Sequence, residues 1–69
     1  MSGGLVVHLK QARQAAGLTQ AQLAERIAAS RKTVNTIENG VFTPSTVLAL
    51  KMARALGTSV HDLFELAEE

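Results

Sequence analysis

Four polar residues that can form hydrogen bonds with base edges recur at helical spacing in the middle of the chain. These residues are Lys32, Asn35, Thr36 and Asn39. At about 100° of rotation per residue, they fall within a sector of about 100° on one side of a helix, and Arg31 lies at its edge. Val34 and Ile37 point to the opposite side. Lys and Arg donate to guanine, Asn pairs with adenine and a Thr methyl contacts thymine, so this face predicts reading of base pairs in a DNA groove.

A polar stripe on a helix also has a simpler interpretation, because most such stripes are solvated surface. Two further features favour nucleic acid. The stripe follows a short helix and a tight connection, and helices joined in this way form a helix-turn-helix, whose second helix can enter the major groove. Gln20 opens the first of these helices, where its side chain and backbone amide are placed to meet a phosphate oxygen.

Other kinds of chemistry have little support in the sequence. The chain has no Cys, and neither His8 nor His61 has a second metal donor at a useful spacing; Asp62 adjoins His61 but is expected to cap a helix. No nucleophile with a positioned base is recognisable, so we expect no metal, no cofactor and no catalytic activity. With Phe42 and Phe64 as the only aromatic residues, the sequence offers no stacking platform for RNA, and double-stranded DNA is the expected partner.

The length and composition predict one small globular domain over residues 1–69. A chain of 69 residues is too short for two domains. Its residues are 46% hydrophobic and 19% charged, a composition that is too apolar for a disordered chain. No apolar run approaches the roughly 20 residues that a membrane span needs, and no signal-peptide pattern follows Met1. We therefore expect a cytoplasmic protein without membrane contact.

The charges are distributed unevenly, although the net charge is only +1. All seven Lys and Arg precede residue 61, where Glu25 and Glu38 are the only carboxylates, so this stretch carries five net positive charges. The four negative charges that follow come from Asp62, Glu65, Glu68 and Glu69. A basic body with an acidic end is compatible with a nucleic-acid partner despite the low net charge.

Apolar spacing and helix caps predict an all-α chain of five helices. The expected ranges are 5–16, 20–27, 31–39, 46–56 and 60–66. Thr19 and Gln22 have the spacing of a capping box, and Ser30, Ser45 and Ser59 are expected N-caps. The inward residues of the first and last helices are expected to be Leu5, Leu9, Ala12 and Ala16, and Val60, Leu63 and Phe64.

From Leu9 to Phe64 the sequence resembles the phage repressor and Cro-like family of helix-turn-helix DNA-binding domains, the xenobiotic-response-element type of regulator. The likeness is carried by Gly17-Leu18-Thr19-Gln20, Leu23-Ala24, Ser30-Arg31-Lys32-Thr33-Val34, Ile37-Glu38-Asn39-Gly40, Pro44-Ser45, the run from Leu50 to Gly57, Ser59-Val60 and Asp62-Leu63-Phe64. The resemblance implies a compact five-helix, lambda-repressor-like fold. It also implies a sequence-specific transcriptional regulator, which we expect to be a repressor that occupies an operator.

The resemblance further implies roles for individual residues. The family positions that usually touch base edges correspond to Arg31, Lys32, Asn35 and Thr36. Those that usually bind the DNA backbone correspond to Gln20, Thr33 and Asn39. The family often pairs an Arg of the first helix with a Glu late in the third, which implies an ion pair between Arg13 and Glu38. Such a pair has a physical reason as well, because an unpaired Glu38 at the border of the buried face would lose hydration and repel DNA.

Ala28 departs from the family pattern, in which Gly is common in the turn between the two helices. If this residue has a positive φ, Ala costs about 1 kcal/mol relative to Gly. We therefore expect either a slightly strained turn or a different turn geometry.

The apolar residues after the third helix leave two interpretations open. Val41, Phe42, Val47 and Leu48 provide more apolar surface than the helix stripes require, so they either cover the core or form a self-complementary patch. Because such proteins usually place two recognition helices about 34 Å apart, we expect a homodimer, formed by the start of the fourth helix with Val41 and Phe42 or by the last helix with Leu66. The alternative function is a protein-interaction module, such as an antitoxin or adaptor, in which the acidic end or the Val41-Phe42 surface binds a partner protein.

Overall fold

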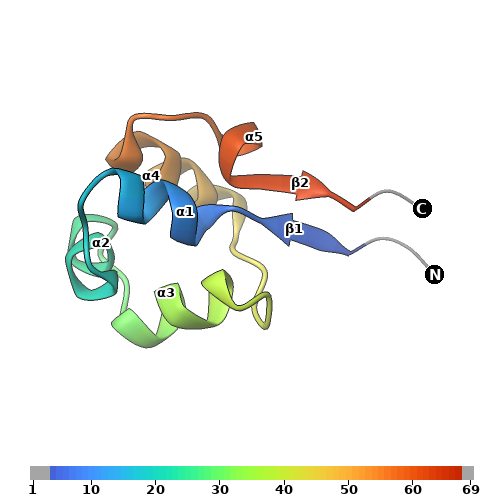
Figure 1. The fold of residues 1–69 in the computed structure, drawn as a ribbon. Helices are drawn as coiled ribbons and strands as arrows, with labels where there is room; N and C mark the ends of the chain where they lie inside the picture. The colour runs from blue at the N-terminus through green and yellow to red at the C-terminus, as the bar shows by residue number, and fades with distance from the viewer. Residues whose placement is uncertain (1–3, 68–69) are drawn as a thin grey trace.

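The computed structural model describes residues 4–67, so Glu68 and Glu69 of the acidic end lie outside it. Five helices and two short strands make up the fold (Figure 1). Their bounds are β1 Leu5–Val7, α1 Leu9–Ala15, α2 Gln20–Arg26, α3 Arg31–Glu38, α4 Thr46–Leu56, α5 Val60–Leu63 and β2 Phe64–Leu66. The predicted five-helix architecture is confirmed, and none of the helices in the described range is long and apolar enough to cross a membrane.

The fold is mostly helical as predicted, but the predicted ranges of the first and last helices, 5–16 and 60–66, were too long. Residues 5–7 form β1 and residues 64–66 form β2, which pair in antiparallel register with Leu5 opposite Leu66 and Val7 opposite Phe64. β1 and β2 run side by side and extend away from the helical body (Figure 1). In β1, the consecutive β-branched residues Val6 and Val7 favour extended backbone. Pairing between β1 and β2 supplies hydrogen bonds to backbone groups that would otherwise bond within a longer helix.

The predicted helix caps are present. Thr19 and Gln22 form a reciprocal capping box at the start of α2, with the Thr19 hydroxyl 3.1 Å from the Gln22 amide nitrogen. The hydroxyls of Ser30, Ser45 and Ser59 likewise accept from backbone amides at the starts of α3, α4 and α5. Each cap satisfies an amide that has no partner within its helix, and so fixes where that helix begins.

The core is formed by one apolar stripe from each helix. Its members are Leu9, Leu23, Ala24, Ile27, Val34, Ile37, Ala49, Met52, Ala53, Leu63 and Phe64. These include most of the predicted inward residues, but Leu5 and Ala16 are exposed. Leu5 belongs to β1 rather than to a helix, and Ala16 lies in the turn after α1, which ends at Ala15. The position that the predicted stripe missed is Arg13, which is buried on the inner side of α1.

Ala28 has a φ of +56°, a conformation that L-residues rarely adopt. The amide of Ala29 bonds the carbonyl of Ala24 at 2.9 Å and that of Ala28 bonds Glu25 at 3.3 Å, which is the pattern of a left-handed helix C-terminus. The same pattern ends α1 and α4, where Gly17 and Gly57 have φ values of +75° and +67°. Ala28 therefore occupies a position that favours glycine, and the turn is strained as the first of the two alternatives predicted.

We expect Ala28→Gly to raise the free energy of unfolding by about 1 kcal/mol, because the change relieves the left-handed strain of an alanine. Ala28 is exposed, so losing its methyl group removes no core contact. The melting temperature should rise by about 4–8 °C in thermal unfolding followed by circular dichroism. Ala21→Gly is the matched control, since Ala21 is an exposed residue of α2 without a positive φ and should lose stability. A lower melting temperature for Ala28→Gly would contradict this account of the turn.

Candidate nucleic-acid interface

The third helix is held by two fully buried side chains and exposes its opposite face. Val34 and Ile37 are inaccessible to solvent, and they anchor α3 to the core. Arg31, Lys32 and Asn35 are exposed, as is Asn39 at the helix C-terminus. In Figure 1, α3 lies along one border of the molecule, on the side away from α5. Its polar face is therefore open for contact with a large partner.

Thr33 and Thr36 are half-buried, and their hydroxyls already have partners within the protein. The Thr33 hydroxyl lies 2.9 Å from the hydroxyl of Ser30, and the Thr36 hydroxyl donates to the carbonyl of Thr33 at 3.0 Å. Thr36 is thus less accessible than the helical projection predicts. With its donor engaged, the Thr36 side chain keeps a methyl group and an acceptor oxygen for an external contact.

Asn35 and Asn39 lie together on the exposed face. The Asn39 side-chain nitrogen donates to the Asn35 side-chain oxygen at 3.2 Å, one helical turn apart. This bond orients the side-chain amide of Asn35, whose nitrogen remains a donor toward solvent. Asn39, which is expected to bind a phosphate, thus contacts Asn35, which is expected to read a base.

A buried polar cluster lies beneath this face. The Arg13 Nε donates to Glu38 Oε2 at 2.5 Å, and the two side chains are only 10% and 2% exposed. Arg13 also donates to the carbonyl of Leu18 at 2.8 Å, and the Gln20 side chain donates to Glu38 Oε1 at 3.0 Å. The ion pair implied by the resemblance is present, and it joins α1, the start of α2 and the end of α3. It neutralises the one carboxylate of α3, which lowers the repulsion of an anionic partner.

The bond between Gln20 and Glu38 is the feature of this site that the sequence did not predict. The two residues are 18 positions apart on different helices, and no spacing rule relates them. The signal that could have found it is the spare acceptor capacity of a buried carboxylate. Arg13 donates to both oxygens of Glu38, with Nη2 at 3.2 Å from Oε1, but each oxygen can accept a second hydrogen bond.

A hollow of about 680 Å³ opens between the end of α1 and the start of α2. Its lining residues are Arg13, Gln14, Gly17, Leu18, Thr19, Gln20, Ala21 and Arg31. Arg31 thereby shares one hollow with Gln20, which brings a predicted base-reading residue and a predicted phosphate-binding residue together. A hollow that is lined by arginine side chains and by the first residues of α2 suits an anion.

The remaining ionisable groups have structural contacts. His8 Nε2 lies 2.6 Å from Glu65 Oε1, with both side chains partly exposed, and this contact links β2 to the residue after β1. Hydrogen bonds from Thr58 and then Ser59 lower the pKa of the Asp62 carboxyl, which is a cap partner at the start of α5. Within residues 4–67, no group of three or more His, Cys, Asp or Glu side chains gathers as a metal site would require.

Comparison with known proteins places this geometry in a family. The helix-turn-helix family pattern matches residues 9–63, which covers all five helices. The chain belongs to the Cro/C1-type helix-turn-helix family. Its relatives in this family are transcriptional regulators, so the protein is a DNA-binding regulator of the helix-turn-helix type.

One relative and two solved structures illustrate the range of the family. The chain is 42% identical to an uncharacterised helix-turn-helix transcriptional regulator of Methanothermobacter thermautotrophicus, over 88% of this chain and 90% of that protein. It is similar to the restriction-modification controller protein C.AhdI of Aeromonas hydrophila, with 35% identity, a TM-score of 0.74 and coverage of 78% and 82%. The clp gene regulator ClgR of Corynebacterium glutamicum is 33% identical with a TM-score of 0.75; the match covers 78% of this chain but 57% of ClgR.

Proposed function

We propose that this regulator is a sequence-specific repressor that acts in the cytoplasm by occupying an operator in double-stranded DNA, with α3 in the major groove. The observation that carries the proposal is the two-sided character of α3. Val34 and Ile37 are fully buried behind it, while Arg31, Lys32 and Asn35 are exposed in front of it. These three side chains have the donors and acceptors that read guanine and adenine, and Thr36 adds a methyl group for thymine.

In this proposal, contacts with phosphates fix the position of the protein along the DNA. Gln20 at the start of α2 lines the same hollow as Arg31, which opens α3, and Asn39 lies at the other end of α3. Thr33 faces outward between them, half-buried. Contacts at both ends of α3 would fix its depth and angle in the groove, and base contacts would then supply the specificity.

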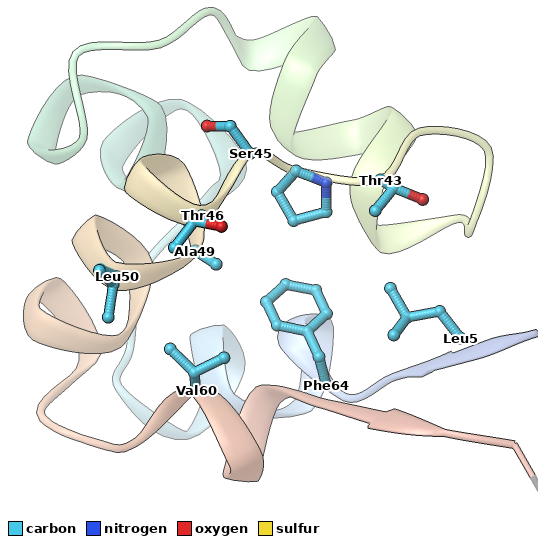
Figure 2. A pocket seen from close by; sticks show the side chains of 9 residues that line it. Leu5, Thr43, Ser45, Thr46, Ala49, Leu50, Val60 and Phe64 are labelled. Atoms are coloured by element: carbon cyan, nitrogen blue, oxygen red, sulfur yellow. The ribbon is translucent and has the colours of Figure 1, made fainter.

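We further propose that the protein acts as a homodimer through an apolar face formed by β1, β2, α4 and α5. A hollow of about 340 Å³ lies there, and Figure 2 shows the Phe64 ring within it, with Leu5, Leu50 and Val60 around it. Leu50 is 56% exposed and Val47, one turn before it, 63%. Protruding aliphatic side chains beside an apolar hollow suit a two-fold contact, in which each copy fills the hollow of the other. Of the two surfaces expected from the sequence, Thr46 at the start of α4 and Val60 of α5 line this hollow, whereas Val41, Phe42 and Leu66 do not.

Leu50→Lys should shift the protein to a monomer at micromolar concentration, because it places a charge in the proposed contact. Sedimentation velocity provides the measurement, and Gln11→Lys, an equal charge change on the exposed side of α1, is the control that should stay dimeric. Since Leu50 is half exposed, the melting temperature of the isolated subunit should change little. A wild-type protein that sediments as a monomer throughout the micromolar range would exclude the homodimer.

Titration of the protein with labelled duplexes tests the proposed function. Selection from a random library should yield a preferred sequence, and this duplex should bind more tightly than random DNA. If a dimer neutralises about six phosphates, the logarithm of the affinity should fall with the logarithm of the salt concentration with a slope near −5. Equal affinity for selected and random duplexes would contradict a sequence-specific regulator.

A further inference from the structure

The loop after α3 is fixed along the exposed side of that helix. The backbone amides of Val41 and Phe42 both donate to the carbonyl of Thr36, at 2.9 and 3.2 Å. Gly40 makes the turn with a φ of +74°. Val41 is 78% exposed and Phe42 51%, and neither belongs to the core cluster, so they do not cover the core as one interpretation of the sequence expected.

These two side chains line a hollow together with the outer face of α3. The hollow measures about 310 Å³, and its other lining residues are Lys32, Thr33 and Thr36. The hydroxyls of Thr33 and Thr36 form hydrogen bonds within α3 and its N-cap. Most of the surface of the hollow is therefore formed by the methyl groups of these threonines, the Phe42 ring and the Val41 isopropyl group. Lys32 contributes the one charged group. The hollow is therefore an apolar cup with a cation at its rim, set within the proposed base-reading face.

Only one group at the edge of the base pairs in the major groove is apolar, and this is the C5 methyl of thymine. We infer that Phe42, with Val41 and the methyl group of Thr36, forms a cup that reads a thymine methyl. This inference rests on the proposed function, since it requires α3 to lie in the groove. The rim cation favours DNA over an apolar protein partner, because Lys32 lies where a phosphate or a guanine would compensate its charge.

The hollow also differs from the face proposed for the dimer. It shares no residue with the apolar hollow between β1, β2, α4 and α5. Val41 and Phe42 are therefore assigned to DNA, and the apolar face to the second copy. This assignment gives Val41 and Phe42 a role that differs from both interpretations of the sequence, which were to cover the core or to form a self-complementary patch.

Deoxyuridine provides the test, because it differs from thymidine only in lacking the C5 methyl. Each thymine of the selected duplex is replaced in turn, and the affinities of the wild type and of Phe42→Ala are measured by fluorescence anisotropy. At one position of each half-site, loss of the methyl should weaken wild-type binding by about fourfold, the value expected for exposing one buried methyl-sized group. The same replacement should have little effect on Phe42→Ala, which should already bind the thymine duplex more weakly by a similar factor.

Val6→Ala is the control, since it truncates a partly exposed valine of β1 outside the hollow and should keep the full response to deoxyuridine. Equal deoxyuridine effects in the wild type and Phe42→Ala, or no sensitive position, would overturn the inference while leaving the proposed function intact. A Phe42→Ala protein that loses dimerisation but keeps the response to deoxyuridine would also overturn it, in favour of a protein contact. Failure of the wild type to prefer any duplex would instead contradict the proposed function itself.

Discussion

Arg13→Met is expected to destabilise the fold by about 3 kcal/mol, because it leaves the Glu38 carboxylate buried without its cation. A chain of 69 residues has a total stability of about 3–10 kcal/mol, so this loss is a large part of the whole. The melting temperature should fall by at least about 12 °C in thermal unfolding followed by circular dichroism. The carbonyl of Leu18 also loses its partner, which adds to the effect.

The matched experiment removes the second charge as well. Arg13→Met combined with Glu38→Met leaves no uncompensated buried carboxylate, and it should recover part of the lost stability. Recovery will be incomplete because the Gln20 amide loses its acceptor. If the double variant is no more stable than Arg13→Met, the loss does not come from the stranded charge of Glu38, and the buried pair has been misinterpreted.

Asn35→Ala should relax the sequence preference without abolishing DNA binding. A bidentate contact between Asn and adenine contributes about 1–3 kcal/mol of discrimination, so affinity for the selected duplex should fall by about 5- to 150-fold per half-site. Affinity for random duplexes should change little, because phosphate contacts supply most of it. The measurement is the ratio of the two affinities at one salt concentration.

Lys51→Ala is the control for this ratio. Lys51 lies on α4, away from the polar face of α3, and its removal should change both affinities to a similar small extent. Asn35 is exposed, so its replacement should leave the melting temperature nearly unchanged. Equal losses on selected and random duplexes for Asn35→Ala would show that Asn35 does not read a base.

The sequence predicted the helices well where caps and apolar spacing agreed. The range predicted for α4, 46–56, matches the observed Thr46–Leu56, because Ser45 and Gly57 mark its ends locally. The start of α2 follows from the capping box of Thr19 and Gln22 in the same way. These signals act over a few residues, so they can be recognised without knowledge of the fold.

The features that the sequence did not predict depend on contacts between distant segments. Three residues are too few to show the alternation of a strand, and Leu5–Val7 becomes β1 only because residues 64–66 lie beside it. The hydrogen bond from Gln20 to Glu38 and the placement of Phe42 beside Lys32 likewise depend on how helices and loops pack. In the candidate site, sequence identified which side chains lie on α3, whereas the structure shows which of them already contact one another.

The most direct test of the account is an NMR titration of the protein with its selected duplex, in which every backbone amide is followed. The account predicts that the largest changes fall on Arg31, Lys32 and Asn35, with further changes at Gln20, and that amides of α5 move little. Large changes on α4 and α5 with an unperturbed α3 would contradict the claim that the exposed face of α3 binds DNA.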